Sequence, residues 1–328
     1  MLITENLGKT YKTKVRSGLL KRDKLEVEAV KGLNMEVRKG QIVGLLGING
    51  AGKTTTIKML STLLEPSKGS ASIDGLNLVK DAVKIKKVIN MIAGGERMLY
   101  WRLTGRENLW YYGQLYDIPE GRLDRRIDEL LSLVGLEDSQ HMPVERYSKG
   151  MKQRLQIARG LINDPNYIFM DEPTIGLDAP IAKELRNYAR KLAHVQGKSI
   201  ILTSHYMHEV EELCEYIYVL DKGNLIVEGT PKELAMIAWD EKTLRIEVNN
   251  FTLEAEKAIQ HLCSYAGAEL HMENNEQHDE LVIKSTEDIS GQVAEILSKF
   301  QVSIKKFYVE EPKLEDAIIK LSGRGQYA

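Results

Sequence analysis

The residues with the clearest chemical potential lie in the segment GINGAGKT at 47–54, which fits the pattern G-x-x-x-x-G-K-[ST]. Glycines let the backbone wrap closely, so that its N–H groups point at phosphate oxygens, and the start of the following helix adds positive potential. We expect Lys53 to reach the β- and γ-phosphates of ATP and the Thr54 hydroxyl to ligate Mg²⁺. The alternative is a tight turn that binds nothing, but a buried strand before the segment and a helical pattern after it favour a phosphate loop. The residues expected to contact nucleotide here are Gly47, Asn49, Gly50, Ala51, Gly52, Lys53, Thr54 and Thr55.

Two adjacent acids end a second apolar run, YIFMDE at 167–172. A buried strand with this ending is expected to stop beside the phosphate loop, where Asp171 would hold Mg²⁺, usually through water. Glu172 would polarise the water that attacks the γ-phosphate. Apolar strands that end in acids are common, so this pattern alone is weak support for hydrolysis.

Between these two segments lies YSKGMKQR at 147–154, and here a family resemblance becomes specific. The segment resembles the signature motif of ATP-binding cassette (ABC) proteins, in a variant with Lys at the third position. Ser148 and the backbone of Gly150 precede a helical pattern and form a second anion-binding helix end. In the family, this end contacts the γ-phosphate of ATP held by the other subunit. An ordinary capped helix with Ser148 as N-cap is the alternative, and the position between the other two motifs favours the family interpretation.

The resemblance implies roles for further residues. The segment IGLD at 175–178 resembles the D-loop, which links the two sites of a dimer and here includes Asp178. His205 resembles the switch histidine, which would hydrogen-bond the γ-phosphate. Tyr11 resembles the aromatic residue that stacks on adenine, with a half-exposed strand tyrosine as the alternative. A zinc site at His205 and His208 is disfavoured because no Cys or carboxylate spacing accompanies them. The residues expected to act in catalysis are Glu172, His205 and Lys53.

The elements that must position these residues alternate between short apolar runs and helix-period segments. Three runs predict buried strands of a parallel sheet covered on both faces, namely 41–47, 167–172 and 199–205. Apolar runs on both sides of DKGN at 221–224 predict a hairpin, and a short helix from Pro231 follows it. The resemblance, which covers residues 1–238, implies an α/β P-loop NTPase cassette with an antiparallel β subdomain and a helical subdomain at about 96–162.

Residues 239–328 have a rhythm of their own, in the order strand, helix, strand, strand, helix, strand. This order predicts a small accessory α+β domain of ferredoxin-like type. A last helix from Pro312 follows it. The sequence EPKLED at 311–316 resembles the ending of cassette subunits that serve export-type transporters with separately encoded membrane subunits, and so does the insertion between Tyr11 and Val27.

The composition limits the partners of this 328-residue chain. Lys and Arg number 45 against 47 Asp and Glu, and no domain carries the basic excess of a nucleic-acid-binding protein. We see no signal peptide and no apolar run near the roughly 18 residues that span a bilayer, so a membrane function requires a separate partner chain. Cys214 and Cys263 fit small buried side chains in a reducing compartment. We therefore expect a cytoplasmic protein, peripheral on the cytoplasmic face of the membrane.

The sequence departs from the family where the family places a Gln that contacts Mg²⁺ and the attacking water. The aligned position is Gly95, so that one ligand is missing or Glu96 replaces it, and we expect slower hydrolysis with ATP binding intact. The apolar cluster at 98–101 is either core packing or part of a groove for a helix of the membrane chain. The basic insertion at 12–24 is either a solvated loop or a contact with anionic lipid headgroups or the membrane chain.

One chain offers one phosphate loop and one signature segment. The resemblance implies a head-to-tail homodimer in which each ATP lies between Lys53 of one chain and Ser148 of the other. ATP binding would close this dimer, hydrolysis would open it, and permease subunits would convert the motion into transport, with export favoured. Two alternatives are a soluble cassette ATPase acting on ribosomes or DNA, which would carry paired cassettes, and a regulatory subunit without turnover, which Glu172 and His205 argue against.

Overall fold

The computed structural model describes most of the chain, and its residues fall mainly into two compact units, Met1–Lys232 and Glu233–Lys320. The described residues are 1–16, 22–93, 98–238, 242–275, 278–310 and 312–321. The Gly95 position and residues 17–21 of the basic insertion lie outside them. No helix in these described ranges is both long enough and apolar enough to cross a membrane.

The first unit is built on a six-stranded sheet with the strand order β10-β9-β3-β8-β7-β6. Its strands are β3 (Ile42–Leu46), β6 (Ile89–Ala93), β7 (Tyr167–Asp171), β8 (Ser199–Thr203), β9 (Tyr216–Asp221) and β10 (Asn224–Gly229). All pairs are parallel except the β9–β10 hairpin, which confirms the predicted parallel sheet and its hairpin. Every residue of β3 and β8 is buried, as expected for strands covered on both faces. The three predicted strands end one or two residues earlier than expected.

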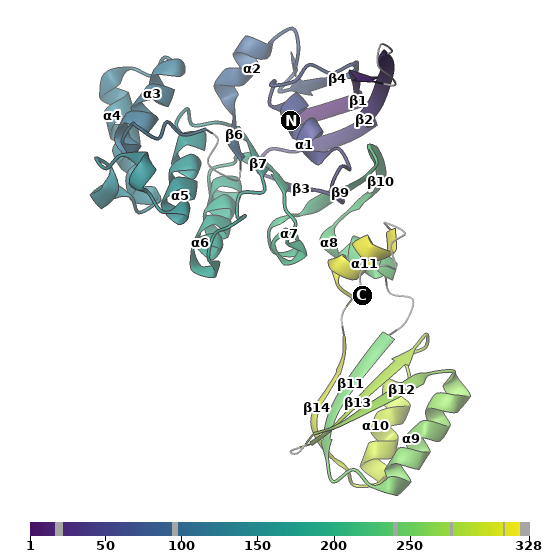
Figure 1. Cartoon of the computed structure of the whole chain (residues 1–328). Coiled ribbons are helices and arrows are strands. Elements are labelled where there is room, and N and C mark those ends of the chain that lie inside the picture. Colours follow the sequence, from purple (N-terminus) through teal and green to yellow (C-terminus); the bar gives the residue numbers. More distant parts are fainter. Residues whose placement is uncertain (17–21, 94–97, 239–241, 276–277, 311, 322–328) are drawn as a thin grey trace. The chain divides into compact units, whose positions relative to one another are not determined.

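Two layers cover this sheet. On one side lie α1 (Lys53–Leu60) and a second, antiparallel sheet with the order β2-β1-β4-β5. The strands of this sheet are β1 (Leu2–Arg16), β2 (Arg22–Val37), β4 (Lys68–Ile73) and β5 (Leu76–Asn77). Ile57 of α1, Leu33 of β2 and Phe169 of β7 share one buried core. On the other side lie α6 (Ala179–Arg190) and α7 (Met207–Leu213), as Figure 1 shows.

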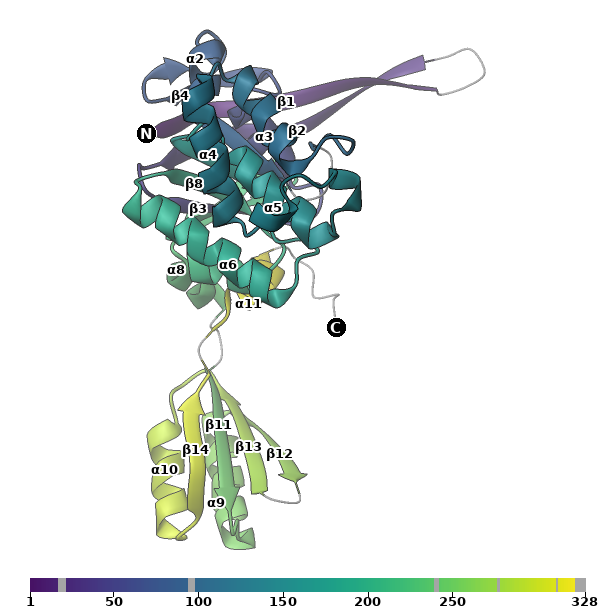
Figure 2. The ribbon, with the colours of Figure 1, turned by 90° about the vertical axis from the view of Figure 1, so that its left-hand side faces the viewer.

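The described residues on either side of 17–21 belong to two long paired strands. Strands β1 and β2 pair in antiparallel register from Leu2 opposite Val37 out to Arg16 opposite Arg22. Figure 2 shows the two strands running out together from the body of the unit. The backbone on both sides of residues 17–21 is therefore paired strand, and the two interpretations of the basic insertion, a solvated loop or a contact with lipid headgroups or the membrane chain, both remain predictions.

Three helices make up the helical subdomain, and Figure 1 shows them grouped together: α3 (Gly105–Leu115), α4 (Glu120–Leu133) and α5 (Lys149–Gly160). α3 begins with a capping box, in which the Thr104 hydroxyl accepts from the Glu107 N–H and the Glu107 carboxylate accepts from the Thr104 N–H. The connection before it crosses 94–97, outside the described residues. Between α1 and α3 the chain passes through α2 (Ala82–Val88) and β6.

The second unit contains the predicted strand and helix order. Its elements are β11 (Lys242–Asn249), α9 (Leu253–Ala266), β12 (Glu269–Asn275), β13 (His278–Ser285), α10 (Ser290–Lys299) and β14 (Ser303–Val309). The antiparallel sheet has the order β12-β13-β11-β14, and both helices cover one face of it, as expected for a ferredoxin-like fold. Ile246, Ile259, Leu281 and Leu297 are fully buried between sheet and helices. Helices α8 (Pro231–Ala235) and α11 (Leu314–Leu321) are the short helices predicted near Pro231 and Pro312.

Candidate nucleotide-hydrolysis site

The phosphate loop connects β3 to α1 and requires glycine at two tightly packed positions. Gly47 has φ 144° and Gly52 has φ 108°, both in the region that side chains disfavour. A Cβ on Gly47 would overlap the carbonyl oxygen of Leu220 in the neighbouring strand β9. A Cβ on Gly52 would lie 2.5 Å from the carbonyl oxygen of Ala29 in β2. The neighbouring strands therefore fix the path of the loop, which turns directly into the first turn of α1.

Lys53 folds back over this loop. Its Nζ donates to the carbonyl oxygens of Gly47 at 2.5 Å and Ile48 at 3.1 Å. Burial lowers the pKa of Lys53, while the negative charges of Glu172 and Asp171 oppose this shift. Lys53 is only 6% exposed, and within the described ranges no carboxylate forms an ion pair with its ammonium group, so an incoming phosphate would provide the negative charge that this buried cation lacks.

A hydroxyl and a carboxylate meet beside the loop. The Thr54 Oγ1 lies 3.4 Å from Asp171 Oδ2, at the end of β7. The other carboxylate oxygen of Asp171 accepts a hydrogen bond from the Thr203 Oγ1 at 2.7 Å. Hard oxygen donors of this kind suit Mg²⁺, which is held by one or two protein ligands together with phosphate and water oxygens. Thr54 and Asp171 therefore fit a magnesium ion.

The side chains of Glu172 and His205 are in direct contact. Glu172 has φ 53°, in the left-handed region, and its N–H donates to the backbone oxygen and to the Oγ1 of Thr203, both at 3.1 Å. Its Oε1 lies 2.6 Å from the His205 Nε2. The two side chains are 27% and 42% exposed, so that solvent and substrate can reach them. A carboxylate in contact with an imidazole can accept a proton from water.

The signature and D-loop residues occupy helix starts. The Ser148 Oγ accepts from the Met151 N–H at 3.2 Å and caps α5. The Asp178 Oδ1 accepts from the Ile181 N–H at 3.1 Å and caps α6. Gly150 allows close packing of these helices, because a Cβ there would lie 3.3 Å from the Ile181 Cδ1. Among the described residues of one chain, no hydrogen bond joins either capping side chain to the phosphate loop.

Tyr11 lies on β1 near the start of α1. Its hydroxyl is 3.5 Å from the Thr55 Oγ1, and 40% of the residue is exposed. The Lys9 Nζ lies 5.9 Å from the centre of its ring. The structure thus brings Tyr11 and Thr55 together beside the phosphate loop.

Thr203 is a site residue to which the sequence analysis assigned no role. It touches both acids that end β7, because Asp171 and Thr203 are directly opposed in the parallel pairing of β7 and β8. Gln153 was also missed: this buried side chain donates to the carbonyl oxygen of Pro173 at 2.7 Å and connects α5 to the segment after Glu172. The polar residue at the end of β8 was a signal for Thr203, but strand register was needed to use it.

A separate groove lies between the core and the helical subdomain. Its volume is 440 Å³, and its apolar lining includes Leu63, Val83, Met98 and Leu115. In the adjacent cluster at 98–101, Leu99 is buried while Tyr100 and Trp101 are about half exposed, at 47% and 49%. Leu99 therefore packs in the core, whereas the role of Tyr100 and Trp101 in a groove for the membrane chain stays a prediction.

The sheet, the phosphate loop and the acids that end β7 define a P-loop ATPase. The family model described as ABC transporter matches residues 30–175. Over 208 residues the chain is 41% identical to the ABC transporter ATP-binding protein NatA of Bacillus subtilis (strain 168), covering 63% of this chain and 84% of that protein. It is 32% identical over 329 residues to the linearmycin resistance ATP-binding protein LnrL of the same organism, covering 99% of each.

Solved structures agree with these relatives. A dimeric ATP-binding cassette in a post-hydrolysis state, bound to ADP and Pi, superposes with a TM-score of 0.61 at 25% identity, covering 70% of this chain and 98% of that one. The chain belongs to the ATP-binding proteins of ABC transporters, which confirms the resemblance. It is an ATP-binding and ATP-hydrolysing subunit whose turnover drives transport, and it belongs to cassettes that dimerise.

Proposed function

We propose that Glu172 is the general base of ATP hydrolysis and that His205 orients it and binds the γ-phosphate. The observation that carries this proposal is the 2.6 Å contact between Glu172 Oε1 and His205 Nε2, next to Asp171. In this arrangement Glu172 accepts a proton from the attacking water, and the imidazole N–H can hold the carboxylate until phosphate arrives.

Lys53, Thr54 and Asp171 would bind the remaining charge of ATP. Lys53 exchanges its carbonyl contacts for phosphate oxygens, and the backbone N–H groups of the loop surround the same phosphates. A bound Mg²⁺ would neutralise charge on the β- and γ-phosphates, with Thr54 and Asp171 as its protein-side groups. Tyr11 would stack on the adenine, and Gly47, Asn49, Gly50, Ala51, Gly52 and Thr55 would complete the contacts.

The working unit that we propose is a head-to-tail homodimer. Ser148 and Gly150 of one chain would bind the γ-phosphate of the ATP held at Lys53 of the other chain, and Asp178 would contact the opposite site. This proposal draws support from the position of Ser148 at the start of α5, where the Ser148 hydroxyl accepts a hydrogen bond from its own helix, and from the dimeric state of a related cassette. ATP then bridges the two chains until hydrolysis cleaves it into ADP and phosphate, which repel each other.

We also propose that separate permease subunits dock on the apolar groove, on the cytoplasmic face of the membrane, and that transport is export. Leu63 and Val83, two apolar residues that line this groove, are 60% and 74% exposed, and exposed apolar patches mark sites of protein interaction. Relatives over most of this chain are described as linearmycin resistance and daunorubicin/doxorubicin resistance proteins. In this proposal residues 1–238 are the nucleotide-binding domain, and residues 239–328 are an accessory domain.

The replacement Glu172→Gln tests the catalytic and dimer proposals together. With saturating ATP and Mg²⁺, we expect phosphate release to fall to background and a stable dimer to appear in size-exclusion chromatography. Lys53→Ala in the same background is the control and should remain monomeric, because it removes the phosphate contact. A Glu172→Gln chain that stays monomeric in saturating ATP would contradict the shared-nucleotide dimer, and one that releases phosphate at the wild-type rate would contradict the role of Glu172.

A further inference from the structure

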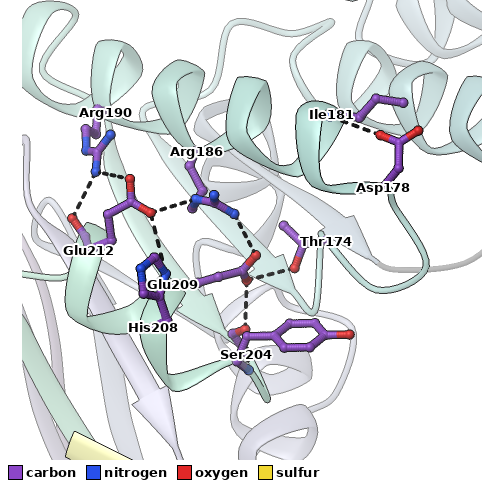
Figure 3. A network of polar contacts seen from close by, with 10 residues as sticks. Thr174, Asp178, Ile181, Arg186, Arg190, Ser204, His208, Glu209 and Glu212 are labelled. Atoms are coloured by element: carbon purple, nitrogen blue, oxygen red, sulfur yellow. Dashed lines mark hydrogen bonds and ion pairs between the residues drawn. The ribbon is translucent and has the colours of Figure 1, made fainter. Parts of the chain in front are cut away.

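A buried carboxylate, that of Glu209, belongs to the network of polar contacts shown in Figure 3. Glu209, on α7, is only 5% exposed. Its Oε2 accepts hydrogen bonds from the Thr174 Oγ1 at 2.8 Å and the Ser204 Oγ at 2.9 Å. Its Oε1 lies 3.1 Å from Arg186 Nη1 on α6. The Glu209 side chain thus connects α7 to Thr174, Ser204 and Arg186, and among the described residues no hydrogen bond joins it to the phosphate loop.

Each hydroxyl in this network belongs to a segment that carries a catalytic residue. Thr174 follows Glu172 by two positions, and Ser204 directly precedes His205. The Ser204 Oγ also accepts from the Tyr206 N–H at 3.0 Å, so it fixes the backbone on both sides of His205. Thr174 and Ser204 are 5% and 3% exposed, so water cannot readily replace Glu209 as their partner.

The network continues into the helix that begins at Asp178. Arg186 Nε lies 2.8 Å from Glu212 Oε2, and Arg190 Nη2 lies 2.6 Å from Glu212 Oε1. Burial alone would raise the pKa of Glu212, but the hydrogen bond from Arg190 and the charge of Arg186 lower it below its ordinary value. Two arginines of α6 are therefore held by two glutamates of α7, and α6 carries the D-loop residue Asp178 as its N-cap.

The charge of Glu209 explains why these contacts are strong. A carboxylate accepts hydrogen bonds from hydroxyl and guanidinium groups more strongly than a neutral amide does. Neutralising it would weaken two hydroxyl contacts and leave Arg186 without one of its two anionic partners in a partly buried position. The consequence would be looser tethering of both catalytic segments, while the phosphate loop, which Glu209 does not touch, would keep its geometry.

We infer that Glu209 is a positioning residue for ATP hydrolysis, which holds the segments of Glu172 and His205 at the spacing of their contact and ties both to the helix that starts at Asp178. This inference rests on the catalytic roles proposed above. Glu209 acts through the residues that it fixes and touches neither nucleotide nor water in the reaction. Because small displacements of reacting groups lower the rate strongly, its loss should lower kcat and not ATP affinity.

The test compares Glu209→Gln with Glu211→Gln, an exposed glutamate on the same helix, in phosphate-release assays. We expect kcat of Glu209→Gln to fall by about tenfold or more, in the range seen when second partners of catalytic groups are removed. The Kd for a non-hydrolysable ATP analogue should stay within about twofold of wild type, and Glu211→Gln should match wild type in both. In a His205→Ala background, Glu209→Gln should lower the remaining rate by less than about threefold, because neighbours that act as a unit are not additive.

Two results would overturn the inference: a wild-type kcat for Glu209→Gln, or an equal fold-loss in the wild-type and His205→Ala backgrounds. If Glu209→Gln fails to fold, Ser204→Ala and Thr174→Val remove one hydroxyl each and keep the Glu209–Arg186 pair. Each of these should lower kcat with the Kd unchanged, and a wild-type kcat in both would overturn the inference. The proposed catalytic roles fail separately, when Glu172→Gln releases phosphate like wild type.

Discussion

The path of the phosphate loop depends on the absence of a side chain at Gly47, and Gly47→Ala tests this dependence. At φ 144° an added Cβ is strained whatever the space around it, which costs about 1–3 kcal/mol. The same Cβ would overlap the carbonyl oxygen of Leu220 and would lie 2.8 Å from the Ala51 Cβ. Because Leu220 O is a backbone atom of β9, no side-chain rotation relieves the overlap, and overpacking adds about 1–3 kcal/mol.

Gly75→Ala is the matched control. Gly75 has φ 80° in the turn between β4 and β5, and an added Cβ there meets no atom within 4 Å. Its cost is therefore backbone strain alone, about 1–2 kcal/mol. The difference between the two variants reports the packing of Gly47 against Leu220 and Ala51.

Urea unfolding followed by circular dichroism gives the free energy of unfolding, and titration with a fluorescent ATP analogue gives the Kd. We expect Gly47→Ala to lose about 2–6 kcal/mol of stability, the sum of strain and overlap. We expect its Kd for ATP to rise at least tenfold, which corresponds to about 1.4 kcal/mol, because the loop must move. Gly75→Ala should bind ATP like wild type. The reasoning is refuted if Gly47→Ala matches Gly75→Ala in stability and wild type in Kd.

Three further predictions concern separate features. Tyr11→Ala should weaken ATP binding about 2- to 12-fold, as expected from about 0.5–1.5 kcal/mol of stacking, while Tyr11→Phe keeps it; an unchanged Kd for Tyr11→Ala would leave only a half-exposed strand tyrosine. The double variant Leu63→Asp with Val83→Asp should abolish co-purification with a multi-spanning membrane chain from detergent and should preserve phosphate release. The control Val195→Asp, at a site outside the groove that is 75% exposed, should change neither result. Retained co-purification of the double variant would refute the groove as the docking site. Gly95→Gln should raise turnover without changing the Kd for ATP, and an equal rate would count against a missing ligand.

Motifs with strict spacing predicted the elements of the site well. The glycine-rich run, the two acids and the strand-ending histidine each lie where a parallel strand ends, so alternation of apolar runs and helical segments was enough to place them. Strand ends were less accurate: the run predicted to reach His205 ends as a strand at Thr203. There the backbone leaves the sheet as the Ser204 side chain bonds the Tyr206 N–H and Glu209, a local interaction that competes with strand pairing.

Partners that depend on register or on long-range packing were not predictable. Asp171 and Thr203 are neighbours because β7 and β8 pair in one register, and a slip by one residue would point the threonine to the other face. Glu209 follows helical spacing with Val210 and Leu213 and resembles an ordinary polar residue of an amphipathic helix. Only the packing of α7 against α6 shows that it is buried and that three segments meet at its carboxylate.

Thr203 shows why the acids that end β7 form one unit. Its single hydroxyl donates to Asp171 at 2.7 Å and accepts from the Glu172 N–H at 3.1 Å. One oxygen atom on the neighbouring strand thus contacts both the expected magnesium ligand and the backbone of the expected base, and the Thr203 backbone oxygen adds a second contact to the Glu172 N–H. Glu172, whose backbone lies in the left-handed region, receives this contact at its N–H. A displacement of Asp171 would therefore move the Thr203 hydroxyl and, with it, the backbone of Glu172. The geometry therefore connects the proposed metal ligand Asp171 to the proposed base Glu172 through Thr203.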